Sequence, residues 1–211
     1  MSLAGCRRPA KGWARTKFMK MRKQTMATNT VDRAGDAHGG NGEAQAGKFE
    51  IFRFQDAVDS RDNPSSLLIE PLPERLLPLQ NQVKESGLND AAEIKYLVKL
   101  PGFSVTHVWF KHDYPLPLHS HNADCLYYIV AGTIRLGSQT LGPRDSFFVP
   151  CDVPYQFRPG AEGVELLEIR HVTEVNLRHF SKSETFWQKA LETVLANRDS
   201  WRDAKKPPLN C

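Results

Sequence analysis

The sequence predicts an all-β domain, either an antiparallel sandwich or a small barrel, followed by one C-terminal helix. Between Glu93 and Val172, apolar and polar residues alternate in short runs, as they do in strands with one buried face. Turn residues separate these runs about every eight to twelve positions, a spacing typical of antiparallel β folds. After Arg178 the apolar residues recur with a helical period instead. A chain of 211 residues is long enough to bury one such core.

Residues 1–46 are predicted to be a disordered basic tail that ends in small polar residues with nothing to bury. The chain has 28 Lys and Arg against 24 Asp and Glu, a formal net charge of +4. Eight of the basic residues lie within residues 1–24, which contain no acidic residue, so the rest of the chain is mildly acidic. A basic block without a recognition helix is usually solvated, so we expect no nucleic-acid partner. The block fits either a mitochondrial-type leader or a start assigned upstream of the true one.

The composition also argues against membrane insertion and disulfide formation. The sequence has no run of about 18 apolar residues, which a transmembrane helix requires. The four cysteines are widely spaced and form no CxxC pair, a pattern typical of free thiols in a reducing compartment. We therefore predict a cytoplasmic protein with no membrane partner.

Residues 47–92 are predicted to form an extended arm packed on the domain. The stretch from Pro64 to Pro78 places four prolines among apolar residues. Proline removes a backbone donor and fixes φ, so prolines at this density argue against a long helix.

Residues 93–178 carry the strands of the predicted barrel, with Gly137-Ser138 as a two-residue hairpin turn. Alternation predicts which side chains share a face. In the strand after Pro101-Gly102, the predicted apolar face holds Phe103, Val105, His107 and Trp109. In the strand from Val164 to Val172, it holds Leu167, Ile169 and His171, with Glu168 and Arg170 on the other side.

Residues 179–198 are predicted to form the C-terminal helix. Ser181 and Glu184 have the spacing of a capping box, and apolar residues from Phe186 to Leu195 follow on one helical face. Such a stripe indicates packing on the barrel or at a dimer interface. Residues 199–211 are predicted to be a loose tail.

The residues with the clearest chemistry lie between Pro117 and Gly132. Residues i and i+2 of a strand point to the same side, so His119 and His121 are expected to project together into the barrel. Two convergent imidazoles make half of a metal site. On the next strand, Cys125, Tyr127 and Ile129 are expected to share the inner face.

With these residues, the sequence resembles the cupin superfamily of small double-stranded β-helix, or jelly-roll, proteins. The first cupin motif, of the form G-x5-H-x-H-x3,4-E-x6-G, matches here at His119, His121 and Gly132. The second, G-x5-P-x-G-x2-H-x3-N, is recognisable from Gly142 to Tyr155. The resemblance covers about residues 93–172. It implies a jelly-roll cupin barrel, a small-molecule substrate or ligand, and a homodimer.

Four positions depart from the cupin motifs. The family's metal site uses both histidines and the glutamate of the first motif and the histidine of the second. Here Cys125 stands at the glutamate position and Tyr155 at the last histidine position. Asp113 and Asp152 stand where glycines belong. Two of the four expected ligands are therefore present.

In a first interpretation, His119 and His121 bind a divalent metal with Cys125 and Tyr155 as nonstandard donors. His107 or His171 could complete the site. Thiolate and imidazole donors favour zinc or iron over magnesium or calcium. Iron is the leading expectation, with zinc or manganese as alternatives, and the replaced ligands leave a metal-free site open.

A second interpretation concerns Cys125 alone. Its place in the motif resembles that in mammalian-type cysteine dioxygenases, where the cysteine is cross-linked to an active-site tyrosine and iron is bound by three histidines. Tyr155 is the candidate partner here. Alternatively, Cys125 is a small buried apolar residue, as most free cysteines are.

In a third interpretation, the barrel is metal-free and encloses a ligand among aromatic and histidine side chains. The expected lining residues are His107, Trp109, Tyr127, Phe147, Tyr155, Phe157 and His171. The same aromatic residues also suit a simple hydrophobic core.

The leading functional expectation is a dioxygenase-like oxidoreductase with a metal centre at His119 and His121. Tyr155 then acts as a ligand or as acid and base, and Cys125 modulates the site. The alternatives are a metal-free cupin that binds or senses a ligand, and an isomerase or lyase without redox chemistry.

Overall fold

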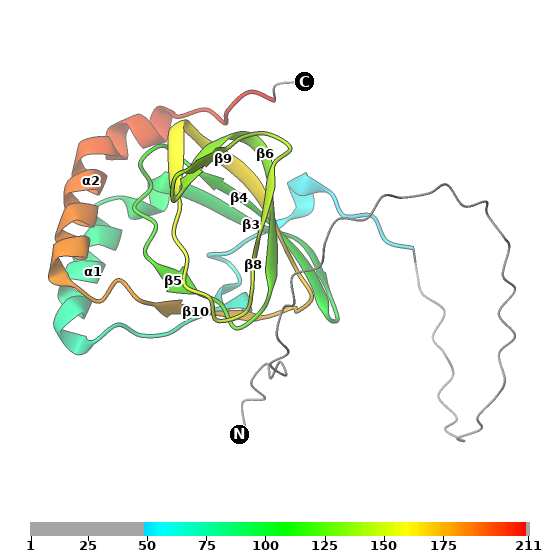
Figure 1. Cartoon of the computed structure of the whole chain (residues 1–211), viewed down its shortest axis with the longest axis horizontal. Helices are drawn as coiled ribbons and strands as arrows, with labels where there is room; N and C mark the ends of the chain where they lie inside the picture. Colours follow the sequence, from blue (N-terminus) through cyan, green and yellow to red (C-terminus); the bar gives the residue numbers. More distant parts are fainter. Residues whose placement is uncertain (1–48, 210–211) are drawn as a thin grey trace, which may run out of the picture. The chain divides into compact units, whose positions relative to one another are not determined.

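Two long neighbouring strands, β6 (Cys125–Leu136) and β9 (Arg158–Arg170), lie at the centre of the fold (Figure 1). The computed structural model describes residues 49–209, and the predicted tail at residues 1–46 lies outside them. The strands build a β-sandwich with a C-terminal helix, so the predicted sandwich is confirmed, although one pair of strands in the smaller sheet is parallel.

The sandwich consists of a seven-stranded sheet and a three-stranded sheet. The larger sheet has the order β1-β3-β4-β9-β6-β7, and β8 also pairs with β6. Its other strands are β1 (Val58–Asp59), β3 (Ala92–Leu100), β4 (Phe103–Phe110), β7 (Gln139–Leu141) and β8 (Ser146–Val149). The smaller sheet has the order β2-β10-β5, with β2 (Leu67–Ile69), β10 (Val175–His179) and β5 (His119–Ser120).

The segment predicted as an extended arm contains a helix, α1 (Leu77–Glu85). Pro78 lies in its first turn, where the missing N–H has no helical acceptor to lose and the fixed φ suits the helix. The prolines therefore set where this helix begins and do not exclude it. Short 3-10 turns occupy much of the remaining segment: η1 (Phe54–Asp56), η2 (Pro64–Ser66), η3 (Glu74–Leu76) and η4 (Leu88–Ala91).

The C-terminal helix, α2 (Glu184–Asp203), begins and ends later than predicted. Ser183 is its N-cap, and its side chain accepts a hydrogen bond from the Phe186 N–H. Ser181 instead accepts one from the Leu118 N–H at 2.9 Å, which ties the approach to the helix to the barrel. Within the stretch predicted as a loose tail, Trp201 is fully buried. Its indole N–H donates to the His112 carbonyl, so the last turn packs on the domain.

Two hydrophobic clusters hold these layers together. One fills the barrel and includes Cys125, Tyr127 and Ile129, which confirms their predicted inner face. The other joins α1 to α2 through Val83, Trp187 and other apolar residues. The two helices lie side by side at one end of the sheets (Figure 1).

The structure reverses the predicted faces of β4 and β9. Thr106 pairs with Glu168 and Val108 with Leu166, and directly paired residues share a face of the sheet. These four side chains face the interior. The residues expected inside therefore face outward.

The reversal has a physical cause at His107 and Trp109, which are buried on the outer face. His107 makes an edge contact with Phe54 of η1, with ring centroids 4.7 Å apart, and bonds Glu165 at 2.7 Å. The Lys206 amine lies over both Phe54 and Trp109. Since β4 is covered on both faces, its hydrophobic pattern alone does not identify the inner one.

Gly132, the spaced glycine of the first motif, lies where two strands approach closely. Its φ is +73°, and a Cβ there would come within 2.2 Å of the Gly163 carbonyl oxygen. Only glycine fits this position without moving β9. Gly137 and Ser138 form the predicted two-residue turn between β6 and β7.

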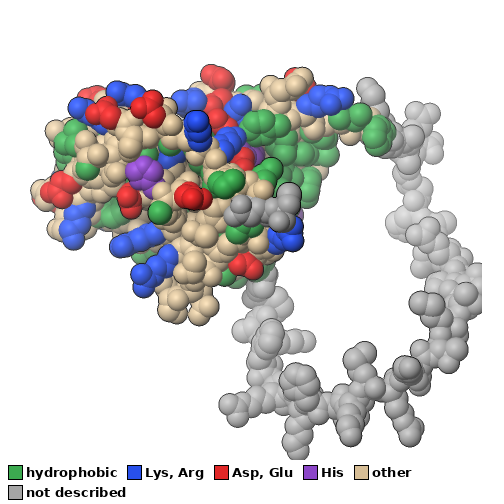
Figure 2. Space-filling model, turned by 90° about the horizontal axis from the view of Figure 1, so that it is seen from above, with side chains coloured by type: hydrophobic (Ala, Val, Ile, Leu, Met, Phe, Trp, Pro, Cys, Tyr) green, Lys and Arg blue, Asp and Glu red, His purple; other side chains and the backbone are tan. Residues whose placement is uncertain are grey.

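Charged side chains of both signs are mixed over the face shown in Figure 2, where hydrophobic side chains also gather in a patch. Within residues 49–209, no helix has the length and apolar character needed to cross a membrane.

Candidate functional site

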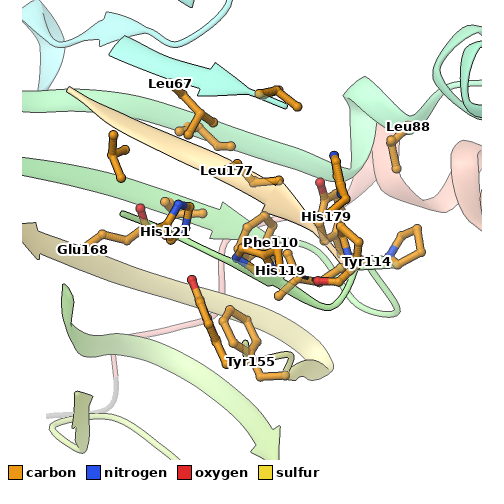
Figure 3. Close-up of a pocket in the computed structure, with 18 of the residues that line it drawn as sticks. Leu67, Leu88, Phe110, Tyr114, His119, His121, Tyr155, Glu168, Leu177 and His179 are labelled. Atoms are coloured by element: carbon orange, nitrogen blue, oxygen red, sulfur yellow. Dashed lines mark hydrogen bonds between the residues drawn. The ribbon is translucent and has the colours of Figure 1, made fainter. Parts of the chain in front are cut away.

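A cavity of about 240 Å³ lies between the two sheets and is closed at one end by α1 and α2. Most of its lining is apolar, with side chains from both sheets and both helices. Four of its polar side chains, His119, His121, Tyr155 and Glu168, lie near one another (Figure 3). The lining residues with titratable side chains are Lys84, Tyr96, Tyr114, His119, His121, Tyr155, Glu168, Arg170 and His179.

His119 and His121 lie at the edge of the smaller sheet, and both are buried. The His119 backbone exchanges two hydrogen bonds with Tyr155 and also pairs with His179 of β10. The two imidazole rings are 5.0 Å apart between centroids and both line the cavity. The structure therefore brings the two motif histidines together, as the i, i+2 spacing predicts.

Backbone carbonyls fix the tautomer of both histidines. Nδ1 of His119 lies 2.7 Å from the Pro117 carbonyl oxygen, and Nδ1 of His121 lies 2.5 Å from that of Asn176. A carbonyl only accepts hydrogen bonds, so each Nδ1 carries the hydrogen. In the neutral rings, each Nε2 then keeps its lone pair.

Burial keeps these rings neutral near pH 7. Desolvation lowers the pKa of His119, and it lowers the pKa of His121 to about 4 with help from the positive charge of Arg170. The site thus offers two uncharged imidazole bases at physiological pH.

Tyr155 packs against His119, and the centroids of the two rings are 4.4 Å apart. Its hydroxyl makes a short hydrogen bond to the hydroxyl of Tyr127, which is fully buried and stacks on Phe147. Burial raises the pKa of both tyrosines, so both hydroxyls stay protonated. Figure 3 shows the Tyr155 hydroxyl directed toward the histidines. Tyr155 and Phe157 line the cavity, whereas Tyr127 and Phe147 support Tyr155 from behind.

Cys125 lies behind the cavity wall. Its thiol is buried and makes a weak 3.8 Å contact to the Leu126 carbonyl. Burial raises the pKa of this thiol to about 12, so it is not a thiolate near pH 7. These surroundings suit a small buried core residue.

Glu168 and Arg170 are members of the site that the sequence reasoning placed on the wrong face. They form a 2.7 Å ion pair at the end of β9, and the Arg170 side chain is only 3% exposed. Burial is the largest single effect and lowers the pKa of Arg170, but the electrostatic effects of Glu168, Tyr127, Cys125 and Tyr155 together outweigh it, so the pKa rises. Figure 3 shows Glu168 beside His121. Two oppositely charged residues at i and i+2, beside the apolar residues Leu167 and Ile169, were the available signal.

His179 is a third cavity histidine, which the sequence reasoning also missed. It lies opposite His119 across the β10–β5 ladder, and burial lowers its pKa to about 4. The signal for it was weak, because β10 is short and follows the cupin motifs.

Besides Tyr127 and Phe147, which lie behind Tyr155, the structure places three more of the predicted pocket residues away from the cavity. His107 and Trp109 lie on the outer face of β4, under Phe54 and Lys206. His171 follows the end of β9 and is exposed. The cause is the same in each case, since the inner face of these strands is the opposite one from that predicted.

The predicted metal donor set does not come together. Among the described residues, no group of three His, Cys, Asp or Glu side chains is placed to hold a metal ion. Cys125 lies behind the cavity wall, and the Tyr155 hydroxyl is bonded to Tyr127. Only His119 and His121 present donor atoms of the expected kind.

Neither a protein-family model nor a curated protein sequence matches this chain. Several solved structures do. The polyketide cyclase RemF from Streptomyces resistomycificus aligns over 49% of this chain and 84% of its own, at 18% identity and a TM-score of 0.42. A protein of unknown function with a cupin-like fold from Ralstonia eutropha aligns over 72% of this chain and 90% of its own, at 14% identity and a TM-score of 0.42. An RmlC-like cupin from Shewanella frigidimarina aligns over 38% and 76%, at 21% identity and a TM-score of 0.36. The structural neighbours of this chain include cupin-fold proteins.

Proposed function

We propose that the cavity catalyses a proton-transfer reaction on a small molecule, as an isomerase or lyase without redox chemistry. The observation that carries this proposal is the pair of neutral imidazoles whose Nδ1 hydrogens are held by the Pro117 and Asn176 carbonyls. Each ring keeps its basic Nε2 for the cavity, and the rings are buried away from bulk water. This is the protonation state that a general base needs before reaction.

In this proposal, Nε2 of His119 or His121 removes a proton from a carbon next to a carbonyl. The ring becomes an imidazolium, and the negative charge of Glu168 partly offsets the burial that lowers the pKa of both histidines. The Nδ1 hydrogen bonds strengthen as the ring gains charge. The proton then returns to a different atom of the substrate, or the adjacent leaving group departs.

Tyr155 has the complementary role. Its hydroxyl stays protonated, so it donates a hydrogen bond to the substrate oxygen on which negative charge develops. Tyr127 holds this hydroxyl in place from the core side.

Two other functions compete for the same cavity. A metal-dependent, dioxygenase-like oxidoreductase is favoured by the two convergent Nε2 atoms but needs donors beyond His119 and His121. A metal-free protein that binds or senses a ligand would use the same groups without turnover.

Deuterium incorporation tests the proposal without knowledge of the natural substrate. Purified full-length protein is incubated in D2O with EDTA under nitrogen, with hydroxyacetone and 2-hydroxyacetophenone as probes. NMR then follows exchange at the carbon next to the carbonyl. We expect wild-type exchange to exceed that of the His119→Gln/His121→Gln variant by about 10²-fold or more, the usual contribution of a positioned base. His171→Gln, an exposed histidine outside the cavity, is the matched control and should leave the rate unchanged.

Equal exchange by the wild type and the double variant would overturn the proposal. Metal analysis of the untreated protein distinguishes the metal-dependent oxidoreductase from the metal-free binding protein. Stoichiometric metal that is lost in the double variant, together with oxygen consumption, would favour the oxidoreductase.

A further inference from the structure

The polar end of the cavity offers hydrogen-bond acceptors that a ligand has to match. Both Nδ1 hydrogens are already used, by the Pro117 carbonyl at 2.7 Å and by the Asn176 carbonyl at 2.5 Å. Nε2 of His119 and Nε2 of His121 therefore face the cavity as bare acceptors. Leaving a buried acceptor unpaired is costly, so a bound ligand is selected to carry hydrogens toward both nitrogens.

The charges in the wall are balanced. Glu168 and Arg170 neutralise each other at 2.7 Å, and Nε of Arg170, which has no hydrogen bond among the described residues, is closed off by its surroundings. The remaining charged lining residue is Lys84, an exposed side chain of α1. A buried anion or cation would thus find no free counter-charge beside the histidines, and an unpaired buried charge is expensive.

The remaining lining and the volume of the cavity limit the size and polarity of the ligand. Leu67, Phe110 and Leu177 are among the apolar side chains of the lining (Figure 3). The volume of about 240 Å³ is below the range of about 300–1,000 Å³ that holds drug-sized molecules. The fitting ligand is small and largely apolar.

We propose that the cavity binds a small, neutral, mainly apolar molecule with two adjacent hydroxyl groups, which donate to Nε2 of His119 and of His121. The two rings are 5.0 Å apart between centroids and both line the cavity, so one small ligand with two neighbouring hydroxyl groups can reach both acceptors. This inference rests on the proposed function for the two nitrogens that it uses, and it names the groups that a ligand of this cavity carries beside the carbonyl on which the proposed reaction depends.

The test compares four probes by isothermal titration calorimetry, with the full-length protein and EDTA present. Catechol carries two donors, guaiacol one, and 1,2-dimethoxybenzene none, while benzoate is an anion of similar size. We expect affinity to fall by about threefold to tenfold for each hydroxyl that is methylated. Benzoate is expected to bind no better than 1,2-dimethoxybenzene.

Variants assign the effect to the histidines. His119→Phe and His121→Phe keep a ring but remove the acceptor, so each should weaken catechol and leave 1,2-dimethoxybenzene unchanged. His121→Gln, whose side-chain oxygen is again an acceptor, should recover part of the catechol affinity. His171→Gln is the control. If either phenylalanine variant fails to fold by circular dichroism, the probe series on the wild type and on His121→Gln still decides.

Two results would overturn the inference. Equal affinity for catechol and 1,2-dimethoxybenzene would remove the need for donors. Tighter binding of benzoate, lost in Arg170→Met, would instead identify an anion site. Because binding is measured without turnover, a preference for catechol without deuterium exchange would refute only the proposed function, and exchange without that preference would refute only the substrate class.

Discussion

The two faces of β9 differ in a way that locates the site. On the inner face, Val164 and Leu166 are fully buried in the barrel core, and the same face continues with Glu168 and Arg170. On the outer face, the residues alongside this ion pair are apolar and only partly buried, namely Leu167 and Ile169. Toward its end, the strand therefore has polar side chains inside and apolar side chains outside.

This inversion reflects what each face meets. The first half of the inner face packs against core side chains, whereas its second half meets a cavity with two histidines. A charged pair is tolerated there because its members satisfy each other at 2.7 Å. Buried polar groups of this kind are costly for a core alone, so their presence makes this end of the barrel the candidate functional site.

The largest expected effect comes from removing one member of the inner pair. Arg170→Met leaves Glu168 as an uncompensated charge in the cavity wall. We expect the free energy of unfolding to fall by about 3–5 kcal/mol, the usual cost of breaking a buried ion pair. Urea denaturation at pH 7 measures it.

The matched control is the exposed pair Arg178–Glu70, at 3.1 Å, on the smaller sheet. Arg178→Met should cost less than about 1 kcal/mol, as exposed ion pairs do. The double variant Glu168→Met/Arg170→Met should regain much of the stability lost in Arg170→Met, because no charge is left unpaired. Equal losses for the buried and exposed pairs would show that the two sites do not differ as described.

A smaller effect is expected from pH, which acts on the inner face through His121. Its pKa is about 4 in the folded protein against an ordinary value of 6.5, because burial and then the charge of Arg170 disfavour the imidazolium. The unfolded chain binds the proton more readily, so the contribution is complete above pH 6.5 and is lost as the pH falls toward 4. We expect His121 alone to account for a fall of about 3 kcal/mol in the free energy of unfolding.

Urea denaturation between pH 7 and pH 4 tests this, with His121→Gln as the variant that should flatten the profile. The pKa values of His119 and His179 are lowered as well, so both act in the same direction and part of the slope remains in the variant. Parallel profiles for the wild type and His121→Gln would contradict the assignment.

The sequence supported the fold more strongly than the site. Alternation and turn residues predicted the sandwich, and the HxH spacing correctly brought His119 and His121 together. The helix α1 was missed because its prolines lie at the start of the helix, where they are compatible with it. The extent of α2 was underestimated because Trp201 lies beyond the last regular apolar repeat, yet packs under the loop at His112.

The site was harder to predict because a period of two gives the alternation of a strand but not which face is inside. On β4, both faces are buried, so His107 and Trp109 looked equivalent to core residues. Toward the end of β9, the apolar side chains face outward, so Glu168 and Arg170 were assigned to the face opposite the interior. Cross-strand pairs such as Thr106 with Glu168 resolve the faces, and they depend on register, which a single strand sequence does not contain.

Substitutions on the outer face are expected to have the smallest effect on the stability of a single chain. Their effect should appear in the oligomeric state. Leu126 and Phe148 are directly paired there, 40% and 54% exposed, beside Ile169. An exposed apolar sheet face is typical of an interface, so we predict that this face joins two copies in the expected homodimer.

Leu126→Lys/Phe148→Lys should halve the mass measured by sedimentation while changing the monomer's free energy of unfolding by only about 0.5 kcal/mol, as surface substitutions do. Leu195→Lys, at an exposed apolar position on α2, should leave the mass unchanged. A wild-type protein that sediments as a monomer would refute the interface, and the apolar outer face of β9 would then need another explanation.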